Sequence, residues 1–304
     1  MSALVARRTS HPLRRKQIAT AYLLLAPFIV VFSAMLIVPL VYSGFLSTFA
    51  TTLIGGTKFT GLANYARAFT DAEFLSGLGR MGLFLIIQVP LMLGLSLFIA
   101  LALDSGRVRG SSAVRLLTFV PYAVPGVVST MMWGYLYGND FGLIGQILRA
   151  LHLPAPNLLS SQNILGSMMN IVTWQYVGYN MIIMFAALRT IPVELFEAAE
   201  IDGASQLRIA WSIKIPAIRN AIMLTVIFSI IGTFQLFNEP SLLRPLNPAA
   251  ISSSYTPNFY AYNLAFINQD INYAAAIAFV LGLFIALISY VVQLSTRSRE
   301  GDGR

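Results

Sequence analysis

The sequence predicts an all-α membrane protein that crosses the bilayer six times. Of its 304 residues, 57% are hydrophobic and only 11% are charged, and the mean hydropathy is +0.71. Soluble domains carry roughly 25% charged residues, and 20 basic with 12 acidic side chains are too few to cover a soluble core of this size. The charges also leave six long uncharged stretches. This composition disfavours a soluble enzyme, a disordered chain and a nucleic-acid-binding protein.

Each predicted span is an apolar stretch with charges only at its ends. A helix rises about 1.5 Å per residue and needs roughly 20 apolar residues to cross the hydrocarbon core. The segment 246–269 is nearly uncharged too, but its asparagines, serines and prolines predict a polar loop. Pro121 and Pro125 predict a kink in the third span. The six predicted helices cover residues 19–45, 83–103, 116–137, 164–188, 221–237 and 273–294.

Basic residues gather on one side of this predicted topology. Fifteen Lys and Arg residues lie in the two tails and in the loops after the second and fourth spans, against five elsewhere. This excess marks the cytoplasmic side, so both termini are predicted to be cytoplasmic. The first apolar stretch is about twice as long as a signal-peptide core and predicts an uncleaved span. The chain then divides into a basic cytoplasmic tail (1–18), one six-span domain (19–296) and a second cytoplasmic tail (297–304).

Several membrane functions require residues that the predicted spans lack. Every acid, including Glu239, lies at a predicted span end or in a loop, whereas ion-coupled carriers usually place a charge near mid-membrane. With no Cys and only His11 and His152 as histidines, neither a catalytic site nor a metal site is predicted. No Gly-Lys pair is present, so a phosphate-binding loop is excluded and any ATP must be hydrolysed by another polypeptide. A secondary carrier of a small polar solute and a non-transporting scaffold remain alternatives.

The segment 189–219 is the one place where charge is dense and mixed, with four acidic and four basic residues. Pro192 suits the first turn of a helix, and three glutamates recur at every third position near its positive N-terminal end. Gly203 is free to adopt a positive φ, Asp202 is placed to cap a second helix, and Pro216 limits that helix. We therefore predict two short helices joined by a bend on the membrane surface.

The same segment carries a resemblance to a known family. An acid followed by two alanines, a glycine six residues after the acid, an isoleucine sixteen after and a proline nineteen after resemble the EAA motif. That motif is typical of permease subunits of bacterial binding-protein-dependent ABC importers. Trp211 and Ile215 depart mildly from the family pattern, which commonly has Phe and Leu there. The matching residues are Glu197, Ala198, Ala199, Asp202, Gly203, Ala204, Ile213 and Pro216.

Shorter matches extend the resemblance over nearly the whole chain. They are similar to the carbohydrate branch of the family, which includes permeases for maltose, lactose and glycerol phosphate. Residues 237–240, Phe-Asn-Glu-Pro, also resemble some disaccharide permeases. The other matching segments are residues 61–65, 121–125, 187–192 and 262–266.

The resemblance implies a type I ABC importer permease fold in the plasma membrane, with no cofactor in this chain. Two partner ATPase subunits would hydrolyse ATP with Mg, and an external solute-binding protein would deliver a sugar, disaccharide or polyol phosphate. A second permease would complete the channel, either another copy of this chain or a paralogue, as is common in the carbohydrate branch. In the segment 189–219, Glu197 would pair with a basic residue of the ATPase. Ala198 and Ala199 would permit close approach, and Gly203 would form the bend.

Passage of a carbohydrate requires amides that match hydroxyl groups and flat aromatic faces. Such side chains cluster in the fourth span, and others lie in the third and fifth. Each has a competing role in packing, at the membrane interface or in hydrogen bonding between helices. The candidates for a substrate path are Trp133, Tyr135, Trp174, Gln175, Tyr176, Tyr179, Asn180, Gln235 and Asn238.

Overall fold

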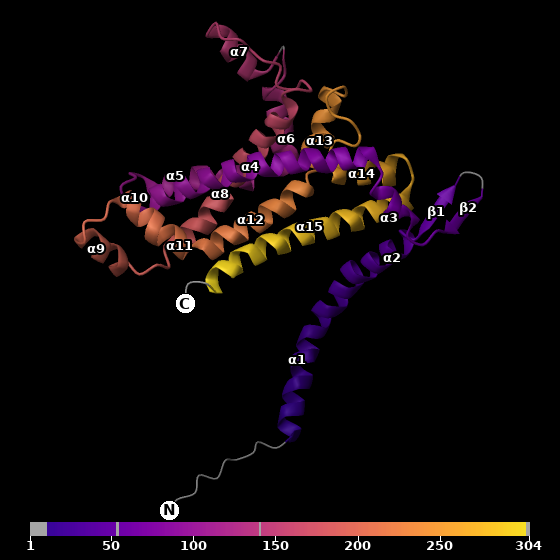
Figure 1. Ribbon diagram of the computed structural model, residues 1–304, viewed down its shortest axis with the longest axis horizontal. Coiled ribbons are helices and arrows are strands. Elements are labelled where there is room, and N and C mark those ends of the chain that lie inside the picture. The colour runs from indigo at the N-terminus through magenta and orange to yellow at the C-terminus, as the bar shows by residue number, and fades with distance from the viewer. Residues whose placement is uncertain (1–10, 53–54, 140, 302–304) are drawn as a thin grey trace, which may run out of the picture.

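The computed structural model describes residues 11–52, 55–139 and 141–301. Long helices lie alongside one another in an elongated bundle, with one small hairpin (Figure 1). The outermost parts of the two predicted tails lie outside the described residues, and helix α1 already begins at His11. The cytoplasmic placement of both tails stays a prediction.

Fifteen α-helices and one two-stranded antiparallel hairpin make up the described part of the chain. Short π- or 3₁₀-helical turns at Ser33–Ile37, Ala210–Lys214, Arg244–Leu246 and Asn263–Ile267 interrupt or extend the helices. The elements are α1 (His11–Phe32), α2 (Val38–Leu46), β1 (Phe49–Thr52), β2 (Gly56–Phe59), α3 (Ala63–Ala68), α4 (Ala72–Asp104), α5 (Ser111–Ala123), α6 (Gly126–Leu136), α7 (Leu143–Ala150), α8 (Ile164–Leu188), α9 (Glu194–Ile201), α10 (Gln206–Ile209), α11 (Ile215–Ala217), α12 (Arg219–Phe234), α13 (Asn238–Leu243), α14 (Pro257–Tyr262) and α15 (Ile271–Gly301).

Five helical segments of the described chain are long and apolar enough to cross a membrane, or six if the bent pair α5 and α6 counts as one span. The five contain the first, second, fourth, fifth and sixth predicted spans. The second begins eleven residues earlier than predicted, at Ala72, because Asp71 caps its first turn by accepting from the N–H groups of Glu73 and Phe74. The five segments are Gln17–Leu46, Ala72–Asp104, Ile164–Leu188, Arg219–Leu246 and Ile271–Leu294.

The third predicted span, residues 116–137, contains the kink predicted from Pro121 and Pro125, and this kink is a full break between two helices. Helices α5 and α6 meet at an angle of 96°, and α6 leads away from the bundle (Figure 1). Pro125 has no N–H to donate and disfavours helical geometry at Val124, whose backbone is extended. The Val124 carbonyl accepts a hydrogen bond from the Gln175 amide at 3.2 Å. A polar group released by the break is thereby satisfied within the protein, as an apolar surrounding requires.

Helices α4, α5 and α8 approach one another closely through small residues. The Ser96 hydroxyl of α4 donates to the Val177 carbonyl of α8 at 2.9 Å. One residue on, a Cβ at Gly178 would lie 1.9 Å from the Thr118 carbonyl oxygen of α5, so only glycine allows this approach. Buried methionines and phenylalanines, including Met81, Phe84, Met168 and Phe234, fill the space among α4, α8 and α12.

Helix α1 has little contact with the rest of the described chain. The most apolar part of the first span is entirely unburied, and α1 diverges from the bundle (Figure 1). Helix α2 returns to the bundle, where Gly44 lies against the Phe279 ring of α15. An exposed apolar helix of this length is stable in lipid, because its backbone hydrogen bonds are satisfied internally.

The segment 246–269, predicted to be a polar loop, is not a candidate span but is more ordered than predicted. It contains α14, whose N-terminus is capped by the Thr256 hydroxyl accepting from the Phe259 N–H at 3.2 Å. The Asn263 amide donates to the Ser253 and Phe259 carbonyls at 3.0 and 2.7 Å. Its polar residues therefore satisfy a folded backbone beside α4 and α15.

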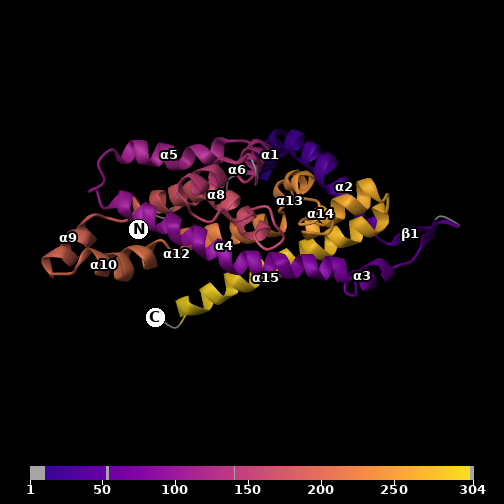
Figure 2. The same ribbon diagram turned by 90° about the horizontal axis from the view of Figure 1, so that it is seen from above.

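The bundle has two distinct ends (Figures 1 and 2). One end, here named the coupling end, carries α9, α10 and α11 together with the last turns of α15. The opposite end, here named the hairpin end, carries β1, β2, α3 and the first turns of α4 and α15. Which end faces the cytoplasm rests on the prediction from basic residues.

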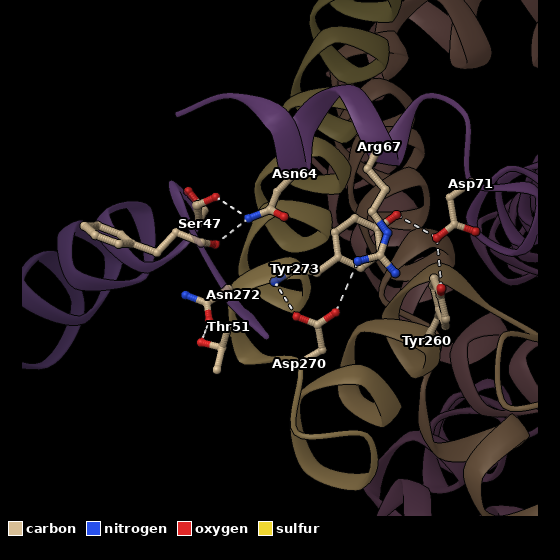
Figure 3. Close-up of polar contacts among 10 residues, drawn as sticks. Ser47, Thr51, Asn64, Arg67, Asp71, Tyr260, Asp270, Asn272 and Tyr273 are labelled. Carbon is tan, nitrogen blue, oxygen red and sulfur yellow. Dashed lines mark hydrogen bonds and ion pairs between the residues drawn. The ribbon is translucent and has the colours of Figure 1, made fainter. Parts of the chain in front are cut away.

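A dense polar network closes the hairpin end, and we name it the hairpin-end clamp (Figure 3). Buried Asn64 of α3 donates to the Ser47 and Phe49 carbonyls at 2.8 and 2.7 Å. The Arg67 guanidinium lies 3.7 Å above the Tyr273 ring and 3.2 Å from Asp270. The clamp consists of Asn64, Arg67, Asp71, Tyr260, Asp270, Asn272 and Tyr273.

Asp71 is the negative centre of this clamp. One carboxylate oxygen accepts hydrogen bonds from the Tyr273 and Tyr260 hydroxyls at 2.6 and 2.9 Å. The other accepts from the N–H groups at the start of α4. Burial alone would raise the pKa of Asp71, but these four hydrogen bonds outweigh it and hold the pKa below its usual value. The same burial and the bond to Asp71 raise the pKa of Tyr260.

Candidate functional site

The segment 189–219, here named the coupling loop, folds at the end of the bundle as two short helical segments joined by a bend, as predicted. Pro192 precedes α9, and the first turn of α9 holds Glu194 and Glu197. Gly203 has a φ of +80°, the left-handed conformation that favours glycine and ends the helix. The prediction for the bend is therefore confirmed.

The cap of the second segment differs from the prediction. The residue at the N-cap of α10 is Ser205, whose hydroxyl accepts from the Arg208 N–H at 3.3 Å. Asp202 instead ends α9, and its N–H donates to the Ala198 carbonyl at 3.0 Å. The bend at Gly203 inserts extra residues before the second helix, so its first turn is out of reach of Asp202. The second segment continues through Pro216, which was predicted to limit it, and ends one residue later at Ala217.

The coupling loop presents large apolar side chains away from the bundle. Ile201, Leu207 and Trp211 are 86%, 70% and 66% exposed. Glu197 and Ala198 are exposed beside them. Apolar groups this exposed on a charged segment are typical of a surface that another protein covers.

A hollow of about 280 Å³ lies between the two halves of the coupling loop. Four of the residues that match the motif line it, so the motif defines a surface and not only a helix stop. Glu197, Ala198, Gly203 and Pro216 do not line the hollow. Its lining is Ala199, Asp202, Ala204, Arg208, Ile209, Ser212 and Ile213.

A separate cavity of about 270 Å³ opens among α4, α8, α12 and α13. Five of the nine predicted substrate-path residues line it: Tyr176, Tyr179, Asn180, Gln235 and Asn238. The other lining residues are Gln88, Met92, Val172, Phe228, Ser229, Gly232, Thr233, Leu236, Phe237 and Glu239. Amides and aromatic faces dominate this wall.

Buried amides of this wall are held in place from behind. The Asn180 Nδ2 donates to the Tyr176 carbonyl at 3.0 Å, and Asn180 is only 3% exposed. The Gln88 Nε2 lies 3.3 Å from both the Thr173 hydroxyl and the Met92 sulfur. Both amide nitrogens donate to groups of the protein. Their carbonyl oxygens accept no hydrogen bond from the described residues, so they can accept one from a ligand hydroxyl.

The other four predicted residues lie outside the cavity lining. Gln175 ties α8 to the break in the third span, accepting from the Ser129 hydroxyl at 3.1 Å and donating to Val124. Trp133 and Trp174 pack edge to face at 5.8 Å. Tyr135 is 62% exposed and contacts the Phe141 ring. Gln175, Trp133 and Trp174 thus contact side chains or backbone of a neighbouring helix, whereas Tyr135 is exposed.

Glu239 is the charged residue among the ten cavity residues that the sequence analysis did not predict. It was assigned to a span boundary, but it lies inside the segment Arg219–Leu246, only 6% exposed. This segment extends beyond the predicted span 221–237: helix α12 ends at Phe234, and α13 continues it from Asn238. One signal was present in the sequence, the Phe-Asn-Glu-Pro segment at 237–240. No Lys, Arg or His lines the cavity, and no cluster of metal-ligating side chains occurs among the described residues.

An all-α membrane bundle with a cavity lined by amides and aromatic rings and with an exposed charged loop at one end is typical of the transmembrane component of a transporter. Residues 92–299 match the family described as "Binding-protein-dependent transport system inner membrane component", and the chain belongs to that family. It is therefore a permease subunit of an ABC importer, a transport component rather than an enzyme, whose family members work with ATPases in separate subunits.

Relatives of known description cover almost the whole chain. The lactose transport system permease protein LacF of Rhizobium radiobacter is 29% identical and covers 95% of this chain and 97% of its own. The diacetylchitobiose uptake system permease protein NgcF of Streptomyces coelicolor is 30% identical and covers 81% and 74%.

Two solved structures show the same fold. Both are bacterial ABC transporters for alginate, one of them in complex with an alginate-bound periplasmic protein. The complex has a TM-score of 0.76 at 19% identity and covers 92% of this chain and 93% of its own. The other structure has a TM-score of 0.78 at 20% identity and covers 93% of this chain and 96% of its own. These likenesses establish a type I ABC importer permease fold.

Proposed function

We propose that this chain forms half of a plasma-membrane channel that imports a carbohydrate, driven by two ATPase subunits that dock on the coupling loop. The exposed surface of the coupling loop carries the proposal, because its acid, small residues and bend lie together outside the bundle. The ATPase subunits would hold ATP and Mg. An external solute-binding protein would deliver the cargo, and a paralogous permease would supply the other half of the path.

Docking is tested with two glutamates of the same helix. Glu197 and Glu194 are both exposed on α9, but only Glu197 belongs to the motif. A tagged wild-type chain purified from its native membranes should bring down an ATPase subunit and a second permease, and the complex should hydrolyse ATP. Glu197→Lys should lose the ATPase while Glu194→Lys keeps it. Solitary purification of the wild type with ion-driven uptake would contradict the proposal.

The cavity supports a carbohydrate as the cargo. Its aromatic faces and amides match the apolar faces and hydroxyl groups of sugars, and relatives are described as permeases for lactose and diacetylchitobiose. Glu239 is buried in the wall and no basic residue lines it, which favours a neutral carbohydrate over a polyol phosphate.

The cargo is tested by uptake in cells with and without this chain. We expect uptake of a neutral mono- or disaccharide that glycerol phosphate does not compete for. Asn180→Ala should lower this uptake while the ATPase subunits remain bound, because it removes only a cavity amide. Uptake of glycerol phosphate at the expense of every neutral sugar would contradict the assignment of a neutral cargo.

A further inference from the structure

A buried ion pair joins the coupling loop to the helix that leads to the cavity. The Lys214 Nζ lies 2.5 Å from an Asp104 carboxylate oxygen, and their side chains are 9% and 5% exposed. The ion pair of Arg67 with Asp270 at the hairpin end is far more open, with side chains 54% and 31% exposed. A charge is rarely buried this completely unless it is paired.

The pair links parts of the chain that are 110 residues apart. Lys214 is the last residue of the π-helical turn inside the coupling loop, and Asp104 is the last residue of α4. Helix α4 continues without interruption from Asp104 back to Met92 and Gln88, which line the cavity. A rotation or shift of α4 at Asp104 therefore changes the cavity wall.

Lys214 also contacts the other half of the coupling loop. Its Nζ lies 4.6 Å from the centre of the Phe196 ring on α9, a cation–π contact. Phe196 directly precedes Glu197, the residue proposed to face the ATPase. One ammonium group thus touches α9 and α4 while belonging to the segment between α10 and α11.

Apolar packing alone would not fix this geometry. Ile218, just after the coupling loop helices, is buried in a cluster with Leu103 and Leu188. Such packing holds the coupling loop against α4 and α8 but does not fix its orientation, because the hydrophobic effect depends on the buried area and not on direction. A short charge-assisted hydrogen bond does define an orientation.

We propose that Lys214 and Asp104 form the joint through which movement of the coupling loop is passed to α4 and the cavity. This proposal rests on the docking of an ATPase subunit on the coupling loop. In this role Lys214 is a positioning residue. When ATP binding moves α9 and α10, the ion pair and the contact to Phe196 carry α4 with them.

A thiol reporter in the cavity wall tests the joint without requiring the cargo. The chain has no cysteine, so Met92→Cys introduces the only thiol of this subunit. The complete complex is purified, and maleimide labelling of this subunit is measured with and without ATP and vanadate. In the otherwise unchanged chain we expect the labelling rate to change by roughly fivefold or more.

Asp104→Asn and Lys214→Gln should each abolish that change while the ATPase subunits remain bound. The double variant Asp104→Lys with Lys214→Asp restores an ion pair and should restore most of the change. Arg107→Gln is the matched control, because Arg107 lies three residues from Asp104 but is exposed, and it should leave the change intact.

Two results would overturn the joint. One is a full labelling change in both single variants, and the other is no change in an assembled charge-swapped variant. If the single variants fail to assemble, the labelling change in the charge-swapped variant, compared with that in the Arg107→Gln control, still tests the joint. Failure of the reporter complex to retain any ATPase subunit would instead contradict the proposed docking.

Discussion

The two ends of the bundle differ in whether their polar and exposed side chains find partners inside the chain. At the hairpin end, charged and polar side chains meet partners inside the chain, and Asp71 alone accepts four hydrogen bonds. At the coupling end, Ile201, Leu207 and Trp211 are exposed, and Glu197 forms no ion pair within the described residues. The polar groups of the hairpin-end clamp are thus satisfied within the chain, whereas the exposed groups of the coupling loop are those that the proposed ATPase subunit would cover.

This difference separates residues that hold the fold from residues that transmit force. Removing a satisfied group at the hairpin end leaves its partners unsatisfied and lowers stability. Removing an exposed group at the coupling end costs the isolated chain little. Stability and transport should therefore respond to different sets of substitutions.

The largest effect on transport is expected at the bend of the coupling loop. A Cβ at Gly203 would meet nothing within 4 Å, so Gly203→Asp should fold and insert at the cost of a positive φ, roughly 1–2 kcal/mol. The added carboxylate would project toward the docked ATPase, and uptake should fall by roughly a hundredfold. Uptake and membrane abundance are measured together.

Gly203→Asn is the matched control for this prediction. Asn and Asp are similar in size and both tolerate the left-handed conformation, so Gly203→Asn should equal Gly203→Asp in abundance and, without the charge, exceed it in uptake. Equal loss of abundance and uptake in both variants would show that Gly203 is a structural helix stop and not part of a docking surface.

The next effect is expected on stability at the hairpin end. Asn64→Ala removes two hydrogen bonds to the Ser47 and Phe49 carbonyls at a site that is 6% exposed. The free energy of unfolding should fall by about 2 kcal/mol. Thermal unfolding in detergent measures it. Asn258→Ala removes a single hydrogen bond, to the Gln235 carbonyl, at a more exposed site, so it should lower the free energy of unfolding by less. An equal loss in the two variants would contradict the idea of a closed clamp.

Acid should weaken the hairpin-end clamp. The pKa of Asp71 is held below its ordinary value of 3.8 in the folded chain. The stability contributed by its carboxylate is thus present at neutral pH, begins to fall as the pH approaches 3.8, and is lost as the pH falls through the folded-state pKa. Wild type should lose more thermal stability over that range than Asp71→Asn, which cannot titrate. Parallel losses in the two proteins would contradict this assignment.

The sequence predicted the parts of this structure that depend on local chemistry. Charge-free stretches located five spans, and Gly203 was correctly placed at a bend because a positive φ depends on one residue. Pro121 and Pro125 predicted a kink, but not that it is a full break, because the open backbone at Val124 is satisfied by Gln175, 51 residues away. Glu239 was placed at a boundary for the same reason, since only the interruption after Phe234 brings it into the cavity wall. Contacts between distant residues leave no pattern in a single sequence.

The smallest effect is expected at the exposed ion pair of the hairpin end. Asp270 pairs with Arg67 at 3.2 Å and also accepts from the Tyr273 N–H at the start of α15. Asp270→Asn keeps a good helix cap and removes only the charge. Because the pair is open to solvent, the free energy of unfolding should change by less than about 1 kcal/mol, and less still at high salt. A loss as large as that of Asn64→Ala would mean that this pair is shielded from solvent, like the pair of Lys214 and Asp104. The two ends of the bundle would then no longer differ in the solvent exposure of their ion pairs.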